Sequence, residues 1–184
     1  MTNKFILLFL TLLSASCATS LEHIRAPSLG NEWKIGYQHR ERFTDNNITE
    51  YVPRNESIRN WSKLYTVQYS KNTNVVPKSF AKALLQRIQL SCPEMKSKLI
   101  NNDNISVMYE WSAPACNNPN APKNSQNINT AQHEIFRIIK GNEGFFKLSY
   151  VEKTKKMNSE TRAKWINKLN KSQIYKDGKM VKAL

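Results

Sequence analysis

Apolar and polar residues alternate in several short segments of this chain, and this limits the folds open to it. Between residues 105 and 113 the apolar side chains occupy every second position, at Ile105, Val107, Tyr109 and Trp111. Successive side chains of a β-strand point to opposite faces of the sheet, so a period of two is typical of a strand with one buried face. Ile105–Ala113 is therefore predicted to be a strand, and a sheet is expected at the centre of the fold.

Other segments have strand character too, because they are short, rich in aromatic and β-branched residues and bounded by turn residues. The predicted strands are Glu32–Tyr37, Ile48–Val52, the second half of Asn60–Ser70, Gln132–Lys140 and Phe145–Thr154. Between the last two, Gly141-Asn142-Glu143-Gly144 predicts a hairpin turn. Connections this short favour antiparallel pairing of the strands.

Two segments have helical spacing instead. Pro77–Leu90 begins with a proline, which suits a first helical turn, and its apolar residues recur at helical spacing: Phe80, Leu84, Leu85 and Ile88. A second helix is predicted for about Ser159–Ser172, with Trp165, Ile166 and Leu169 on its buried side. The basic residues of the second helix are expected to lie together on the opposite side: Lys164, Lys168 and Lys171.

These elements predict an α+β fold, in which a single twisted antiparallel sheet has two main helices packed on one side. With 184 residues, the chain is long enough for one domain with a buried core. We expect a flexible tether at residues 17–31, the α+β domain at residues 32–174 and a basic tail at residues 175–184.

Residues 1–16 have the parts of a cleavable export signal. Lys4 supplies the positive charge, Phe5–Leu13 is a nearly unbroken apolar run, and small residues follow it. The run is too short to cross a bilayer as a helix, which takes about 20 residues. Cys17 follows the small residues as in a bacterial lipobox, although Ser14 stands where that pattern prefers an aliphatic residue. Two outcomes stay open: lipidation of Cys17, which anchors the protein to a membrane, or cleavage after Ser16, Ala18 or Ser20, which releases it.

Once Cys17 is lipidated or removed, Cys92 and Cys116 remain as a pair. In an oxidising compartment such a pair most often forms a disulfide. Because Cys92 follows the first predicted helix and Cys116 follows the strand Ile105–Ala113, the bond would pin one to the other. Closing a loop of about 25 residues is worth about 3 kcal/mol in the chain-entropy model.

The net charge of +14 predicts attraction to an anionic surface or polyanion, such as lipid headgroups, lipopolysaccharide, nucleic acid or acidic glycans. Residues 151–184 hold ten basic and three acidic residues, so half of the net charge lies in this final segment. The charge does not choose among these partners. An alternative is that an AT-rich genome favours Lys and Asn, and that most lysines only solvate the surface.

No catalytic motif stands out in the sequence. His133-Glu134 begins like a zinc-protease motif, but Arg137 stands where its second histidine is needed. His39 and His133 would suit ribonuclease-like acid–base catalysis as a pair, but their spacing has no signature. We therefore assign no catalytic residue, no metal site and no cofactor.

Several short stretches carry a resemblance to a known group of proteins. They are Trp33-Lys34-Ile35-Gly36-Tyr37, Glu50-Tyr51-Val52-Pro53-Arg54-Asn55-Glu56-Ser57, Asn60-Trp61-Ser62, Cys92-Pro93, Cys116 and Trp165. In these stretches the chain resembles a group of small exported proteins of gamma-proteobacteria, including Legionella-like intracellular pathogens. The resemblance implies export and a paired Cys92 and Cys116, and it implies no activity. Glu56 and Ser57 are expected to brace a turn, and the polar residues to test first for a site are Glu56, Arg59 and Asn60.

The sequence favours a non-enzymatic exported protein, anchored in the envelope or secreted, whose basic C-terminal helix meets an anionic partner. A membrane would be reached only through a lipid on Cys17. The alternatives are a secreted ribonuclease-like hydrolase and a virulence factor that acts on a host component. A deep pocket in which His39 or His133 meets a carboxylate or a lysine would favour the hydrolase, and solvated histidines over a closed core would favour binding.

Overall fold

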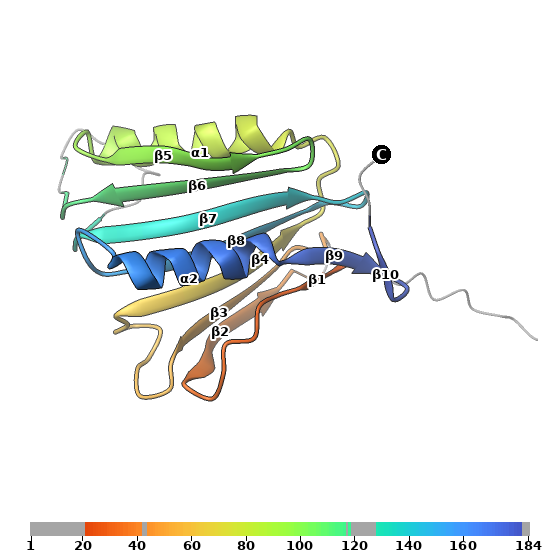
Figure 1. The fold of residues 1–184 in the computed structure, drawn as a ribbon, viewed down its shortest axis with the longest axis horizontal. Helices are drawn as coiled ribbons and strands as arrows, with labels where there is room; N and C mark the ends of the chain where they lie inside the picture. The colour runs from red at the N-terminus through yellow and green to blue at the C-terminus, as the bar shows by residue number, and fades with distance from the viewer. Residues whose placement is uncertain (1–20, 42–43, 117, 119–127, 182–184) are drawn as a thin grey trace, which may run out of the picture.

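The centre of the protein is a seven-stranded antiparallel sheet, seen in a computed structural model that describes residues 21–41, 44–116, 118 and 128–181. The strand order is β2-β3-β4-β8-β7-β6-β5 (Figure 1). The strands are β2 (Trp33–Arg40), β3 (Asn47–Pro53), β4 (Lys63–Ser70), β5 (Lys96–Asn102), β6 (Ser106–Ala113), β7 (Gln132–Lys140) and β8 (Phe145–Glu152). All six predicted strands are confirmed, and the edge strand β5 is the one the alternation did not predict.

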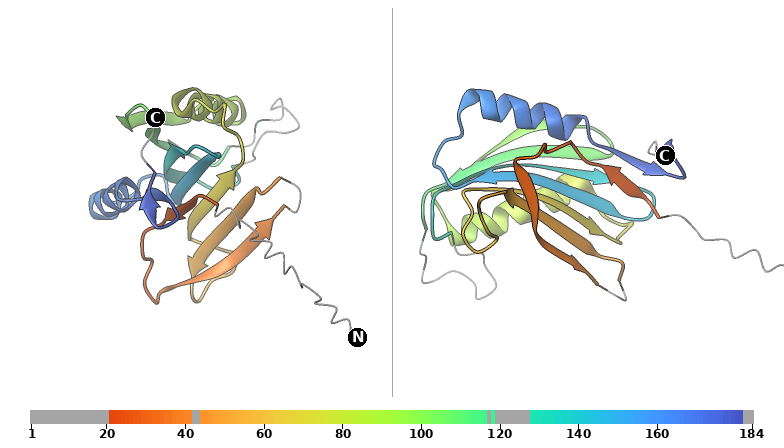
Figure 2. Two further views of the ribbon diagram at one scale, coloured as in Figure 1. Left: turned by 90° about the vertical axis from the view of Figure 1, so that its right-hand side faces the viewer. Right: turned by 90° about the horizontal axis from the view of Figure 1, so that it is seen from below.

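The two helices, α1 (Pro77–Ser91) and α2 (Ser159–Asn170), form where they were predicted. The expectation that both pack on one side of the sheet is wrong, because they cover opposite faces (Figure 2). Leu85 of α1 belongs to the same core cluster as Trp111, whereas Leu169 of α2 shares a cluster with Met108. The domain therefore has three layers: helix, sheet and helix.

Strand β7 shows why the sheet needs a helix on each face. Phe136 and Ile138 join the core beneath α1, while Ile135 and Ile139 join the core beneath α2. All four side chains are at most 3% exposed. A strand with apolar residues on both faces must be covered on both faces, and the central strands β6, β7 and β8 meet this condition.

A second, small sheet corrects the expectation of a single sheet. Its order is β1-β9-β10, with β1 (His23–Arg25), β9 (Gln173–Lys176) and β10 (Lys179–Met180). The chain enters β9 directly from the end of α2 (Figure 1). The segment expected as a tether thus contains β1, and the segment expected as a basic tail contains β10 and the second half of β9.

Glu22 fixes the N-terminal part of the described chain to the β7–β8 turn. Its carboxylate accepts hydrogen bonds from the backbone N–H groups of Asn142 and Glu143, at 2.9 and 3.1 Å. Gly141 leaves room for this carboxylate, because a Cβ atom at this position would push the Glu22 side chain out of its place. The turn itself, residues 141–144, is the predicted hairpin turn.

Cys92 and Cys116 form the predicted disulfide, with their Cα atoms 5.3 Å apart. Cys92 directly follows α1 and Cys116 lies shortly after β6, so the bond pins the helix to the sheet as expected. In the part of the chain that the structure describes, no helix is long and apolar enough to cross a bilayer. The predicted export signal and Cys17 lie outside the described residues.

Candidate binding cleft

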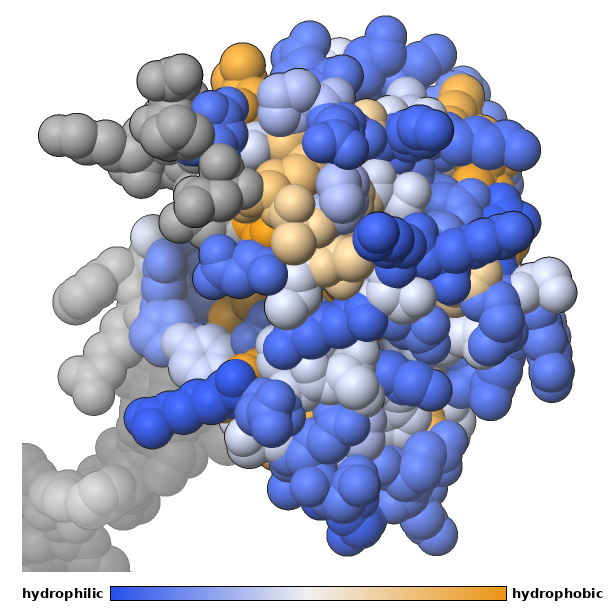
Figure 3. All heavy atoms as spheres, turned by 90° about the vertical axis from the view of Figure 1, so that its left-hand side faces the viewer, coloured by the Kyte–Doolittle hydropathy of each residue, from blue (hydrophilic) through white to orange (hydrophobic). Residues whose placement is uncertain are grey.

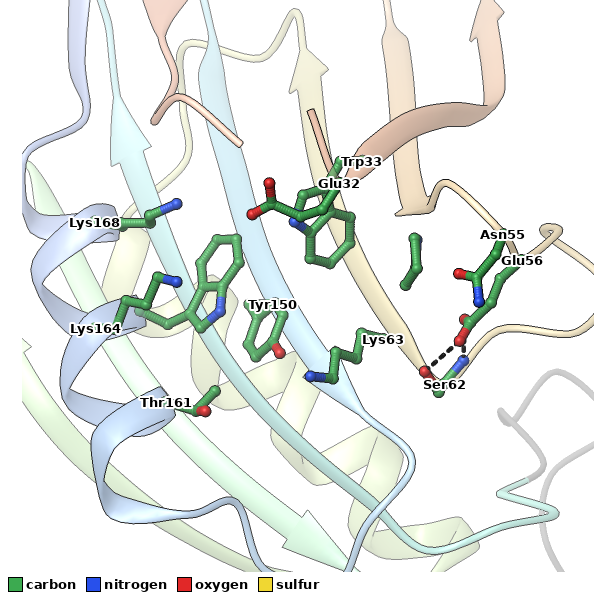
Figure 4. Close-up of a pocket in the computed structure, with 12 residues that line it drawn as sticks. Glu32, Trp33, Asn55, Glu56, Ser62, Lys63, Tyr150, Thr161, Lys164 and Lys168 are labelled. Atoms are coloured by element: carbon green, nitrogen blue, oxygen red, sulfur yellow. Dashed lines mark hydrogen bonds between the residues drawn. The ribbon is translucent and has the colours of Figure 1, made fainter. Parts of the chain in front are cut away.

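A cleft of about 370 Å³ lies between α2 and the loop of residues 54–62, which joins β3 to β4. The lining residues come from both sides and from the strands between them: Glu32, Trp33, Pro53, Asn55, Glu56, Ser62, Lys63, Tyr150, Thr161, Lys164, Trp165 and Lys168. Lys164 and Lys168 extend from α2, and Glu32 and Trp33 face them from the start of β2 (Figure 4). The cleft volume lies at the lower end of the range of small-molecule sites, about 300–1,000 Å³.

The end of the molecule where β4 and α2 begin has a mostly polar surface. Apolar residues gather there only over a small area (Figure 3). A broad apolar face of the kind that marks a protein interface is therefore not visible from this side. A ligand that binds at this end of the molecule would mainly meet polar and charged side chains.

Three sets of contacts hold α2, and with it one wall of the cleft. The Asn158 side chain caps the helix by accepting a hydrogen bond from the Thr161 N–H at 2.7 Å. Arg162 donates to both carboxylate oxygens of Glu110, at 2.7 and 2.6 Å. At the other end, Arg137 Nη1 donates to the carbonyl oxygens of Leu169, Asn170 and Ser172. The lysines of α2 therefore project from a firmly docked helix.

Three stacked or crossed aromatic rings form the floor of the cleft. Trp165 stacks on Tyr150, with ring centres 3.9 Å apart and an angle of 11° between the rings. Trp33 meets Trp165 at 80°, with ring centres 6.1 Å apart. Trp165 and Tyr150 are only 3% and 1% exposed, whereas Trp33 is half-buried. Trp33 is thus the ring with surface to offer a ligand, and the other two rings support it.

Three lysines make the cleft basic. Lys63 Nζ lies 3.8 Å from Glu152 Oε1, and Lys168 Nζ lies 5.0 Å from the centre of the Trp165 ring. Burial and the nearby Lys164 ammonium lower the pKa of Lys168, and the Glu32 carboxylate partly offsets this shift. The repulsion between Lys164 and Lys168 means that an anion between them would be stabilised.

Two carboxylates also line the cleft. Glu56 accepts hydrogen bonds from the backbone N–H and the hydroxyl of Ser62, both at 2.6 Å, which braces the loop as the sequence predicted (Figure 4). Burial of Glu56 raises its pKa, but the hydrogen bonds from Ser62 and Lys63 and the charge of Lys153 together outweigh burial, so the pKa of Glu56 lies below its ordinary value. Glu32 is exposed at the rim. The cleft therefore presents charges of both signs.

The structure brings together three residues that the sequence had singled out in two separate places. Glu56 from the β3–β4 loop lines the same cleft as Lys164 and Lys168 of α2. The expected position of Lys168 opposite the buried side of the helix needs correction, since its ammonium lies near the Trp165 ring and donates to the Ser28 carbonyl at 2.9 Å.

The other predicted site residues do not line the cleft. Lys171 is exposed just after α2, and Arg59 is exposed in the loop. The backbone N–H of Asn60 donates to the Ser57 carbonyl at 3.0 Å, so Asn60 helps to close that loop. The structure therefore does not place these three residues together with Glu56, Lys164 and Lys168.

Sequence reasoning missed four important members of the cleft: Glu32, Trp33, Lys63 and Tyr150. Each was assigned to a predicted strand or its boundary, and none was named as a site residue. Trp33 and Trp165 were both noted as parts of the resemblance, but no spacing in the sequence indicates that two tryptophans 132 positions apart meet. Only the strand order and the position of α2 bring these residues together.

The structure separates the two histidines proposed as a catalytic pair. His133 is buried on the α2 face, where its Nε2 lies 2.8 Å from Glu110 Oε1 and its Nδ1 accepts the Met157 N–H at 2.9 Å. His39 is exposed on the edge strand β2, level with Ile138 across four strand pairs, and Ile138 points to the α1 face. His133 meets a carboxylate but lines none of the described cavities. His39 lines a cavity together with Glu41, but the volume of about 130 Å³ is below the range of small-molecule sites, about 300–1,000 Å³.

Among the described residues, no three His, Cys, Asp or Glu side chains group as a metal site requires. What the cleft offers chemically is recognition: ammonium donors, carboxylate acceptors and one part-exposed indole ring. In comparisons with family models, curated proteins and solved structures, none matches this chain.

Proposed function

We propose that this is an exported binding protein that holds an anionic ligand in the cleft between α2 and the β3–β4 loop. The observation that carries the proposal is the convergence of Lys63, Lys164 and Lys168 on one cleft around Trp33 (Figure 4). Ammonium groups beside a low-dielectric aromatic floor attract an anion more strongly than the same groups spread over a wet surface.

Export is part of the proposal and rests on the sequence of residues 1–17. The disulfide between Cys92 and Cys116 supports it, because disulfides persist mainly in oxidising compartments. Lipidation of Cys17 would hold the cleft near a membrane, and cleavage would release the protein. The ligand can come from lipid headgroups, lipopolysaccharide, nucleic acid or acidic glycans in either case.

The ribonuclease-like alternative is the weaker one, because it depends on a histidine pair. His39 and His133 lie on opposite faces of the sheet, and both ring nitrogens of His133 already have partners. General acid–base catalysis by two histidines needs both within hydrogen-bond reach of one substrate.

The test compares two triple variants that lose the same charge. Lys63→Gln/Lys164→Gln/Lys168→Gln empties the cleft of ammonium groups, and Lys82→Gln/Lys96→Gln/Lys98→Gln removes three exposed lysines from α1 and β5. Binding of tripolyphosphate and trigalacturonate is measured by calorimetry at low and high salt. Loss of at least two charged hydrogen bonds, about 1.5–3 kcal/mol each, predicts a fall in affinity of at least about 100-fold for the cleft variant.

The control variant is expected to bind almost as the unchanged protein does, apart from a small screened effect of net charge. Equal weakening in both variants would mean that only overall charge matters and that the cleft is not the site. Circular dichroism and thermal unfolding verify that both variants keep the fold.

A further inference from the structure

The cleft presents a mixture of groups that no simple polyanion site would need. Three lysines line it, but so do Glu32 and Glu56, together with the neutral side chains of Asn55 and Thr161. We infer that the ligand is an acidic sugar, a ring with several hydroxyls and one carboxylate. This inference rests on the proposed function and names the chemical class of its ligand.

The two carboxylates argue against a densely charged ligand. Each phosphate of a polyphosphate or nucleic-acid backbone would meet repulsion from Glu32 or Glu56 as well as attraction from the lysines. Glu32 lies close enough to Lys168 for its negative charge to offset part of the lowering of the Lys168 pKa by burial and Lys164. A ligand with a single anionic group can direct that group toward the lysines. The neutral parts of the ligand can then contact Glu32 and Glu56.

Hydroxyl groups on the ligand are suitable partners for these two carboxylates. A carboxylate accepts hydrogen bonds from hydroxyls without needing a positive charge, and Asn55 and Thr161 can both donate and accept. Both oxygens of Glu56 accept from Ser62 and the backbone of Lys63 adds a further hydrogen bond, which leaves one of the about four lone pairs of the carboxylate for a ligand. Glu32 faces the cleft from the side opposite Lys164 and Lys168 (Figure 4). A polyhydroxylated ring with its carboxylate toward α2 would satisfy both sides of the cleft at once.

Trp33 gives the ring of such a ligand a surface. Its indole is the half-buried member of the aromatic floor, and its contacts with Trp165 and Tyr150 fix it in place. A rigid, pre-positioned aromatic ring costs little entropy when a flat, weakly polar face packs on it. The carbon-bound hydrogens of a sugar ring form a face of this kind.

An acidic sugar can be free or can be a unit of a polysaccharide, and the two sources share the same chemistry. Galacturonate represents the free sugar acid and trigalacturonate represents a chain. Stronger binding of the trimer would assign the cleft to a glycan, and equal binding would assign it to the free sugar acid. Both results agree with the inference.

The decisive experiment uses Glu32→Gln, because this change should affect the affinities of the two ligand classes in opposite directions. For the galacturonate ligands, a charged hydroxyl acceptor becomes the neutral and weaker amide oxygen of Gln. Their affinity should fall by about three- to tenfold, as expected when a charged hydrogen bond of about 1.5–3 kcal/mol is replaced by a neutral one of about 0.5–1.5 kcal/mol. Tripolyphosphate loses a repulsive neighbour, so its affinity should rise. Galactose, which lacks the carboxylate, should bind the unchanged protein at least about tenfold more weakly than galacturonate does.

Two single variants serve as a matched pair. Lys164→Gln changes a lysine that lines the cleft, and Lys171→Gln changes an exposed lysine outside it. Galacturonate binding should weaken about tenfold in the first, the cost of one charged hydrogen bond, and hardly change in the second. If tripolyphosphate binds through Lys164 while galacturonate and trigalacturonate do not, the sugar inference is overturned and the proposed anion cleft stands. If no probe responds to the cleft lysines, both fail.

Discussion

At the scale of single residues, a buried polar network under α2 decides how the cleft is held. Glu110, only 9% exposed, receives two hydrogen bonds from Arg162 and lies against His133 Nε2. Because His133 Nδ1 accepts the Met157 N–H, the ring proton sits on Nε2 and is donated to Glu110. The hydrogen bond from Arg162 is the main cause that lowers the pKa of Glu110. The carboxylate stays ionised and ties the first half of α2 to β6.

Replacing Arg162 should destabilise the protein and change its response to acid. Arg162→Met leaves Glu110 buried without its main partner, and the free energy of unfolding should fall by about 1.5–3 kcal/mol at neutral pH. A lowered carboxyl pKa stabilises the fold above the unfolded-state value, about 4.3, and this stability is lost as pH falls through the folded-state pKa. The variant should therefore lose less stability on acidification than the unchanged protein does.

Urea unfolding curves at neutral and acidic pH measure this effect, with Arg59→Met as the matched control because Arg59 is exposed in a loop. The control should unfold as the unchanged protein does. An equal acid-induced loss of stability in Arg162→Met would show that Glu110 does not depend on Arg162.

At the scale of elements, the sequence predicted both helices and every strand of the large sheet except the edge strand β5, and it missed the short strands of the small sheet. The strands β1 and β10 have three and two residues, which is too few to show a period. The placement of the helices was predicted incorrectly because the alternation in β6 suggested one wet face. The adjacent apolar pairs Ile138-Ile139 and Phe145-Phe146 were the available signal that both faces are buried.

The cleft could be predicted only in part, for a related reason. Charge and helix position pointed to Lys164 and Lys168, and the turn pattern pointed to Glu56. Trp33 and Lys63 reach the cleft because β2, β3 and β4 pair in order and Lys63 lies opposite Glu152 of β8. No local sequence pattern indicates which strands pair when they lie so far apart in the chain.

The disulfide should matter for α1 and not for the cleft. Cys92→Ala/Cys116→Ala opens a loop of about 25 residues, and the free energy of unfolding should fall by about 3 kcal/mol on the chain-entropy model. The bond lies on the α1 side of the sheet, whereas the cleft is formed with α2 on the other side. Urea unfolding and calorimetry with tripolyphosphate should therefore show lower stability with unchanged affinity. A parallel loss of affinity would mean that the two faces are coupled.

At the scale of the whole molecule, one sheet separates two helical layers, and the candidate site belongs to one of them. The core beneath α1 includes Cys92 and Trp111, and the core beneath α2 includes Trp165 and Tyr150 of the cleft floor. Half of the net charge comes from residues 151–184, the segment that contains α2. Because α2 packs against the aromatic floor, part of this positive charge is concentrated at one cleft.

The four tryptophans allow the most direct test of the anion cleft, because each gives one indole N–H signal in a ¹⁵N-resolved NMR spectrum. Trp33 and Trp165 line the cleft, while Trp111 is buried on the α1 face with its Nε1 donating to Glu134 at 2.9 Å. On titration with galacturonate or tripolyphosphate, the Trp33 and Trp165 signals should shift in a saturable way while the Trp111 signal stays still. Saturable binding that leaves Trp33 and Trp165 unmoved would contradict the assignment of the cleft as the binding site.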